Sequence, residues 1–121
     1  MAYINRWETK GVLKIFSGDI SGDEVFNATV EIEADPRFDE ITYVINDFLQ
    51  ITSVTVVDKD IARLAAIDRA AARTNPNIRI AVVTQTDRIR ESAQQYAEMM
   101  KGSPYQARVF DSVEQARDWA C

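Results

Sequence analysis

Five polar residues stand where predicted strands end or predicted helices begin, and acids and hydroxyls at such places can bind ligands. In open α/β sheets, ligands sit beyond the carboxyl ends of the parallel strands, so side chains at that edge can act together. We expect one rim for a ligand or a partner, formed by Asp19, Asp47, Thr84, Thr86 and Asp58. A divalent metal held by Asp19 and Asp47 would favour a carboxylate-dependent enzyme.

The residue types that are missing argue against catalysis. The chain contains no histidine, and its single cysteine is the last residue, Cys121. Ser-His-Asp and Cys-His nucleophile systems and histidine-ligated metal sites are therefore excluded. The rim also offers no close pair of acids for general acid–base work. We expect no catalytic residue, no metal and no cofactor, and an enzyme is the least favoured of three possible functions.

Structural roles compete with a role in binding for several of these acids. Asp58 precedes a predicted helix at residues 59–73 and matches a helix cap. Asp47 follows a buried strand, where an acid commonly bonds loop amides. Asp68 falls on the packed face of the 59–73 helix, where a carboxylate must find a donor or its pKa rises. An internal pair with an arginine or a backbone amide is the favoured explanation for Asp68.

Aromatic residues indicate a second candidate site, an apolar pocket. Such a pocket would suit a small-molecule or lipid carrier if it measured a few hundred Å³ and opened near residues 46–58. The aromatic side chains that could line it are Trp7, Tyr43, Phe48 and Tyr96, with Tyr105 beside them. Aromatic residues make up an ordinary 9% of the chain, so most of them are also expected in a plain core.

The elements that must position these residues alternate in period, as an α/β fold requires. At 121 residues the chain fits one domain, residues 1–121, with the order β-β-α-β-α-β-α-β-α and a mixed five-stranded sheet. Ser21 with Glu24 predicts a capping box at the first helix. Residues 17–21 are expected to form a loop and residues 49–57 an irregular or weakly extended segment. The strands are expected at 3–9, 12–16, 41–45, 78–83 and 105–110.

Charge and hydropathy restrict the partners and the location. The formal net charge of −5 disfavours nucleic acid and membrane surfaces, which are themselves negative. No apolar run approaches the roughly 20 residues of a membrane span, and the N-terminus does not read as a signal peptide. We expect a cytoplasmic protein, without membrane insertion, that binds a protein partner or pairs with itself as a homodimer.

Several segments, in this order along the chain, resemble the SpoIIAA-like family. They are Gly11–Ser21, Ala34–Phe38, Tyr43–Phe48, Asp60–Ala65, Ile80–Val83 and Val109–Trp119. The resemblance extends over residues 3–119. The family is related to STAS domains and to the anti-sigma-factor antagonist, and its members are mostly uncharacterised bacterial proteins. It implies a β-α superhelix with a mixed sheet and helices packed around it.

One departure from that family changes the expected function. The antagonist carries a phosphorylated serine in an Asp-Ser-Ser-Gly-like turn before a helix. The matching residues here, 52–60, contain no Asp-Ser pair and no glycine, and neither Ser53 nor Thr55 sits in the expected turn. We therefore expect a non-enzymatic STAS-like interaction or regulatory domain that lacks the phosphoserine switch. A small-molecule or lipid carrier is the alternative.

Overall fold

Strands and helices alternate along the computed structural model, which describes residues 2–121. The elements are β1 (Tyr3–Trp7), β2 (Gly11–Ser21), α1 (Gly22–Glu33), the short 3-10 helix η1 (Pro36–Glu40), β3 (Tyr43–Thr55), α2 (Asp58–Ala71), β4 (Arg79–Val83), α3 (Asp87–Met99), β5 (Gln106–Phe110) and α4 (Val113–Ala120). Apart from η1, this order of elements is the predicted one. Within the described residues, no helix is long and apolar enough to cross a membrane.

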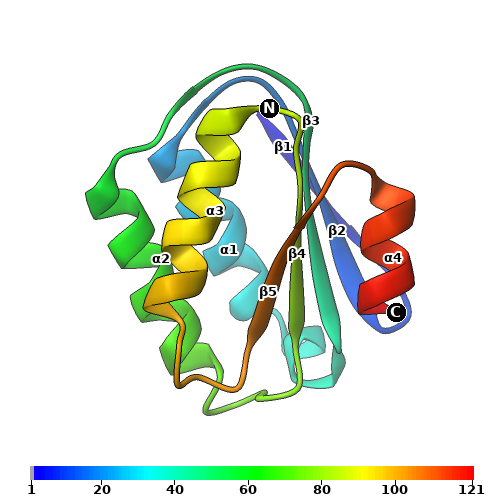
Figure 1. Cartoon of the computed structure of the whole chain (residues 1–121). Coiled ribbons are helices and arrows are strands. Elements are labelled where there is room, and N and C mark those ends of the chain that lie inside the picture. The colour runs from blue at the N-terminus through cyan, green and yellow to red at the C-terminus, as the bar shows by residue number, and fades with distance from the viewer. Residues whose placement is uncertain (1) are drawn as a thin grey trace.

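The strands form one mixed sheet in the order β1-β2-β3-β4-β5. β1 runs antiparallel to β2, and each of the other neighbouring pairs is parallel. Helices α1, α2 and α3 cover one face of this sheet, and α4 covers the other (Figure 1). The predicted fold class, an α/β fold with a mixed five-stranded sheet and helices packed around it, is confirmed.

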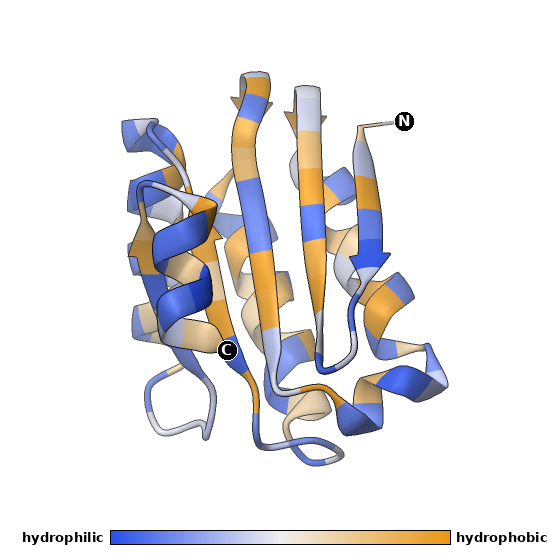
Figure 2. Ribbon diagram, turned by 90° about the vertical axis from the view of Figure 1, so that its right-hand side faces the viewer, coloured by the Kyte–Doolittle hydropathy of each residue, from blue (hydrophilic) through white to orange (hydrophobic). Residues whose placement is uncertain are grey.

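Each strand contributes side chains to both faces because successive residues of a strand point in opposite directions. In β2, Val12 and Phe16 join the larger core under α1, α2 and α3, whereas Leu13 joins the smaller core under α4. β4 repeats the pattern, with Ile80 in the larger core and Ala81 in the smaller one. Polar residues interrupt the apolar bands along the central strands (Figure 2).

The structure has longer second and third strands than the sequence predicted. The prediction of a loop at residues 17–21 was wrong, because they are the end of β2, and most of the segment expected to be irregular or weakly extended is the regular end of β3. These two ends pair with each other, from Ser17 opposite Gln50 to Ser21 opposite Thr55, with one register shift just before Ser17 and one between Gly18 and Asp19. Their mutual backbone hydrogen bonds replace the sheet neighbours that they lack. We call residues 17–21 with 50–55 the ribbon.

Backbone contacts at the helix starts connect the ribbon to the helices. The predicted capping box is confirmed, because Ser21 Oγ accepts from the Glu24 N–H and Glu24 Oε1 accepts from the Ser21 N–H. The first residue of α1, Gly22, lies so close to Asp60 that an added Cβ would fall 2.1 Å from its carboxyl group. This close approach places the starts of α1 and α2 side by side.

Candidate functional site

The five predicted rim residues do not converge on one point. Asp19 is exposed on the ribbon, where its Oδ1 accepts hydrogen bonds from Ser53 Oγ at 2.6 Å and Thr52 Oγ1 at 3.1 Å. Asp58 is an exposed first residue of α2, and Val57 takes the N-cap position that Asp58 was predicted to hold. The ribbon carries Asp19 past the edge of the sheet, because β2 and β3 continue beyond the ends of their other neighbours.

Asp47, Thr84 and Thr86 remain near the carboxyl end of β4, and all three make local hydrogen bonds. Asp47 is buried within β3 and accepts from the Leu49 N–H at 2.9 Å. Thr84 is fully buried, and its Oγ1 accepts from the Thr86 N–H at 3.1 Å, just before α3 begins. These bonds order the chain at the strand end. Within residues 2–121, no group of three or more acids or cysteines could hold a metal ion.

The predicted pocket aromatics separate into two pairs. Phe48 and Tyr96 line a cavity between the sheet and the layer of α1, α2 and α3. Trp7 lies under the guanidinium of Arg37, and Tyr43 belongs to the smaller core on the α4 side of the sheet. Tyr43 faces away from the cavity because it is one residue out of phase with Val44, which lines it.

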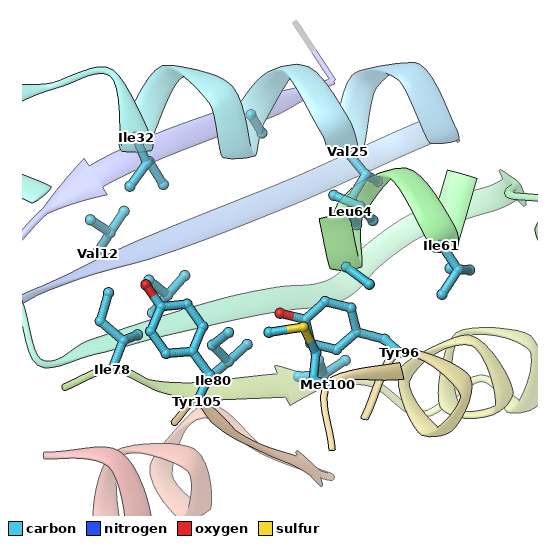
Figure 3. Packing of buried hydrophobic residues seen from close by; sticks show 14 of the residues in the cluster. Val12, Val25, Ile32, Ile61, Leu64, Ile78, Ile80, Tyr96, Met100 and Tyr105 are labelled. Carbon is cyan, nitrogen blue, oxygen red and sulfur yellow. The ribbon is translucent and has the colours of Figure 1, made fainter. Parts of the chain in front are cut away.

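The cavity has a volume of about 110 Å³ and is lined mainly by apolar side chains. Its lining residues are buried except Glu33 and Ala93, which are half-buried. Figure 3 shows how the surrounding core is built, with Val25 of α1 and Leu64 of α2 opposite Tyr96 of α3. The polar residues of the lining are Lys14, Thr29, Glu33, Asn46, Asp68 and Ser92.

Five of the side chains at the cavity form a group that we call the buried polar cluster: Lys14, Thr29, Glu33, Asp68 and Tyr96. Lys14 Nζ donates to Thr29 Oγ1 at 2.8 Å, and Thr29 Oγ1 donates to the Val25 carbonyl at 3.1 Å. On the other side, the Tyr96 hydroxyl donates to Asp68 Oδ2 at 2.5 Å, and the carboxyl group of Glu33 lines the same cavity as Asp68. The cluster thus joins β2, α1, α2 and α3.

The protonation of the cluster follows from its burial. Burial lowers the pKa of Lys14 to about 8, against the attraction of Asp68 and Glu33. Burial, followed by the hydrogen bond and the negative charge of Asp68, raises the pKa of Glu33 to about 10. Burial, the charge of Asp68 and its hydrogen bond raise the pKa of the Tyr96 hydroxyl well above its ordinary value. At neutral pH, Glu33 therefore holds its proton and Lys14 keeps its positive charge.

Asp68 was predicted to pair with an arginine or a backbone amide, but its observed donor is the Tyr96 hydroxyl, and neither Lys14 nor Glu33 was predicted as part of a site. The signal for Lys14 was its place between Val12 and Phe16, since residues 12, 14 and 16 of a strand share one face. Lys14 pairs in register with Asn46, which stands between Val44 and Phe48 in the same way. Two neighbouring strands thus each place a polar residue in the middle of a buried apolar row.

Chemically, the cluster can bind a polar group and hold a proton, but the apolar lining offers little else for a reaction. The acids already attract the lysine, and Asp68 already accepts the hydroxyl of Tyr96. Pairs of titratable groups pushed apart in pKa occur at catalytic sites and also in structural networks. The arrangement by itself favours binding of a small molecule over its conversion.

Comparisons with known proteins support the fold. No protein-family model matches the chain, and no curated protein matches it. The structure of the anti-sigma factor antagonist SpoIIAA in its unphosphorylated form aligns with 97% of this chain and 94% of that chain, at 14% identity and a TM-score of 0.65. An uncharacterised DUF3478-family protein from Shewanella loihica PV-4 aligns with 99% of this chain and 93% of that chain, at 12% identity and a TM-score of 0.58. The resemblance seen in the sequence is thus confirmed for the fold, and this chain has the SpoIIAA-like fold.

Proposed function

We propose that this chain is a non-enzymatic binding domain that recognises another protein through the end of β3 and the start of α2, residues 49–60. The observation that carries the proposal is the ribbon, which extends this segment beyond β1 and β4 and exposes it. Leu49 and Val57, which flank the ribbon part of β3, are 42% and 53% exposed. Protein-binding surfaces combine such apolar side chains with a polar rim.

The polar part of this surface is held in place rather than free. Ser53 and Thr52 both donate to Asp19 across the ribbon, so the exposed face has a defined shape. The sharing of a fold with an anti-sigma factor antagonist, a protein named for its action on another protein, agrees with a regulatory role. The matching segment here lacks the serine turn, so we propose binding that needs no phosphorylation of the domain.

Capture of partners from a native lysate, with a matched pair of surface variants, tests this proposal. Val57→Glu places a charge on the proposed surface, and Ile4→Glu places one at a 59% exposed position on β1. We expect at least one captured protein to be lost with Val57→Glu and kept with Ile4→Glu. Capture that neither variant reduces, or that only Ile4→Glu reduces, would contradict the proposed surface.

A second copy of the chain is one such partner, since small domains commonly pair symmetrically. Light scattering at increasing protein concentration measures this directly. A homodimer should give twice the mass of the chain and should weaken with Val57→Glu. A monomer at every concentration excludes self-association.

A carrier of lipid-sized molecules is the second candidate, and the cavity is the observation that bears on it. Pockets for drug-sized ligands measure about 300–1,000 Å³. At about 110 Å³, the cavity falls below that range. Phe48 and Tyr96 line it as a carrier would require, but its size fits only a much smaller occupant.

A further inference from the structure

The geometry points to the cavity between the sheet and helices α1, α2 and α3 as a binding site for a compact neutral organic molecule. We infer an occupant with an apolar body and one hydrogen-bond-accepting oxygen, such as a ketone or an alcohol. This site is separate from the protein-binding surface proposed above, and neither inference depends on the other.

The size of the cavity limits the body of the occupant. An engineered apolar cavity of about 150 Å³ stays dry and binds benzene. The cavity here, at about 110 Å³, is slightly smaller, so about six or seven heavy atoms fit once nearby side chains adjust. Leu64, Ile80 and Val82 are among the apolar residues that would contact this body.

Two polar groups in the lining call for an acceptor. Ser92 is 7% exposed, and its Oγ lies buried without a hydrogen-bond partner. Lys14 is 4% exposed, and its ammonium group has three N–H donors. Within residues 2–121, one of these donors bonds Thr29 Oγ1. A buried donor without a partner costs about 1–3 kcal/mol, which a ligand oxygen would recover. Together these groups specify a hydrogen-bond acceptor on the ligand.

The charges of the buried polar cluster favour a neutral ligand over a charged one. At pH 7 Lys14 keeps its positive charge and Glu33 keeps its proton, and the negative charge of Asp68 acts on both groups. A carboxylate ligand would add a second negative charge next to Asp68, and an amine would add a second positive charge next to Lys14. Charges brought into a low-dielectric interior without a partner are strongly disfavoured. A neutral oxygen satisfies the donors without adding a charge.

Water is the competing occupant, and the lining argues against it. A buried water needs two to four polar partners, and the cavity has room for several waters. The free polar groups in the lining are few, and Asp68 already accepts the hydroxyl of Tyr96. Most waters in the cavity would therefore face aliphatic side chains.

Four small probes of six or seven heavy atoms test the inference: cyclohexanone, benzene, pivalate and cyclohexylammonium. Binding is measured at pH 7 by ligand-observed NMR and by titration of the amide signals of the folded protein. We expect cyclohexanone to bind saturably and about tenfold more tightly than benzene, the factor that 1.4 kcal/mol of hydrogen bonding provides. Both charged probes should bind at least about tenfold more weakly than cyclohexanone. If none of the four probes binds saturably, as expected for a water-filled cavity, the inference is overturned. Tighter binding of a charged probe than of cyclohexanone would overturn it as well.

A pair of variants on α3 locates the binding. Ala93→Met fills the cavity, while Ala97→Met makes the same change one turn later, outside the lining. We expect cyclohexanone binding to be lost in the first variant and kept in the second. Ser92→Ala is a milder variant that should reduce the preference for cyclohexanone over benzene. Equal binding by Ala93→Met and Ala97→Met, or an unchanged preference in Ser92→Ala, would refute the assignment of the site.

Discussion

Replacement of Glu33 by glutamine should change how the stability of this protein depends on pH. In the folded chain the pKa of Glu33 is raised from 4.5 to about 10, mainly by burial and then by Asp68. Between these two values the folded state holds a proton that the unfolded state has released. Stability therefore falls as pH rises through this range. Glu33→Gln removes the titration and keeps an N–H donor facing Asp68.

The size of the expected stability difference follows from the range of pH over which only the unfolded state has lost the Glu33 proton. From pH 4.5 to 7.5 the full effect would be three pH units at about 1.4 kcal/mol each, or about 4 kcal/mol. Glu33 is only half-buried, and water screens part of this effect, so about 2 kcal/mol is a realistic value. The free energy of unfolding of Glu33→Gln should exceed that of the wild type by about 2 kcal/mol at pH 7.5 and approach it at pH 4.5.

Lys14 adds a second signature at higher pH. Its pKa is lowered from 10.5 to about 8, so between these values the unfolded state holds a proton that the folded state has released. Stability from this group therefore rises with pH above about 8, opposite to the effect of Glu33. Between pH 8 and 10 the two trends oppose each other in the wild type, so its stability should change less there than that of the variant. In Glu33→Gln, where Lys14 titrates without this opposing effect, the stability should rise over the same range.

Urea denaturation at pH 4.5, 6, 7.5 and 9 measures these differences. The groups that face Glu33 and Lys14 across the cluster are Asp68 on α2 and Tyr96 on α3, and both remain in the variant. Glu40→Gln, at an exposed position, is the control and should follow the wild-type profile at every pH. Parallel profiles for the wild type and Glu33→Gln would show that the Glu33 carboxyl is not held protonated, and the charge argument for a neutral ligand would then fail.

Three further predictions concern the contacts that hold the elements together, and chemical denaturation of each variant checks them. Gly22→Ala should lose about 1–2 kcal/mol, because the new Cβ must displace the Asp60 carboxyl; stability equal to the wild type would contradict the close approach. Arg117→Ala should lose about 1 kcal/mol by breaking its two-pronged contact with Glu8 at 2.7 and 2.9 Å, with a smaller loss at low pH as Glu8 becomes protonated. Asn75→Ala should lose about 2–3 kcal/mol, because its side-chain amide donates to two backbone carbonyls at 2.7 and 2.8 Å; a loss below 0.5 kcal/mol would refute that role.

The order of strands and helices could be predicted because local patterns encode it. The Ser21–Glu24 capping box and the change from period 2 to period 3.6 needed no knowledge of distant residues. The ribbon could not be predicted in the same way, because its two halves are stabilised by each other across a separation of more than 30 residues. Read alone, Ser17-Gly-Asp19 has the composition of a loop. Only pairing with residues 50–55 makes it a strand.

The same long-range pairing explains why the predicted rim residues do not lie together. The rule that ligands bind beyond the carboxyl ends of parallel strands assumes that the strands end together. Here β2 and β3 continue as the ribbon, so Asp19 moves away from Asp47, and hydrogen bonds within the chain occupy both carboxylates. The polar residues without such local partners lie instead on the buried face of the sheet. Lys14 is the clearest case, because a lysine in a buried strand must be matched by charges from other elements, and Asp68 and Glu33 supply them. A charged residue in phase with apolar strand neighbours is therefore the better guide to a binding cavity in this fold.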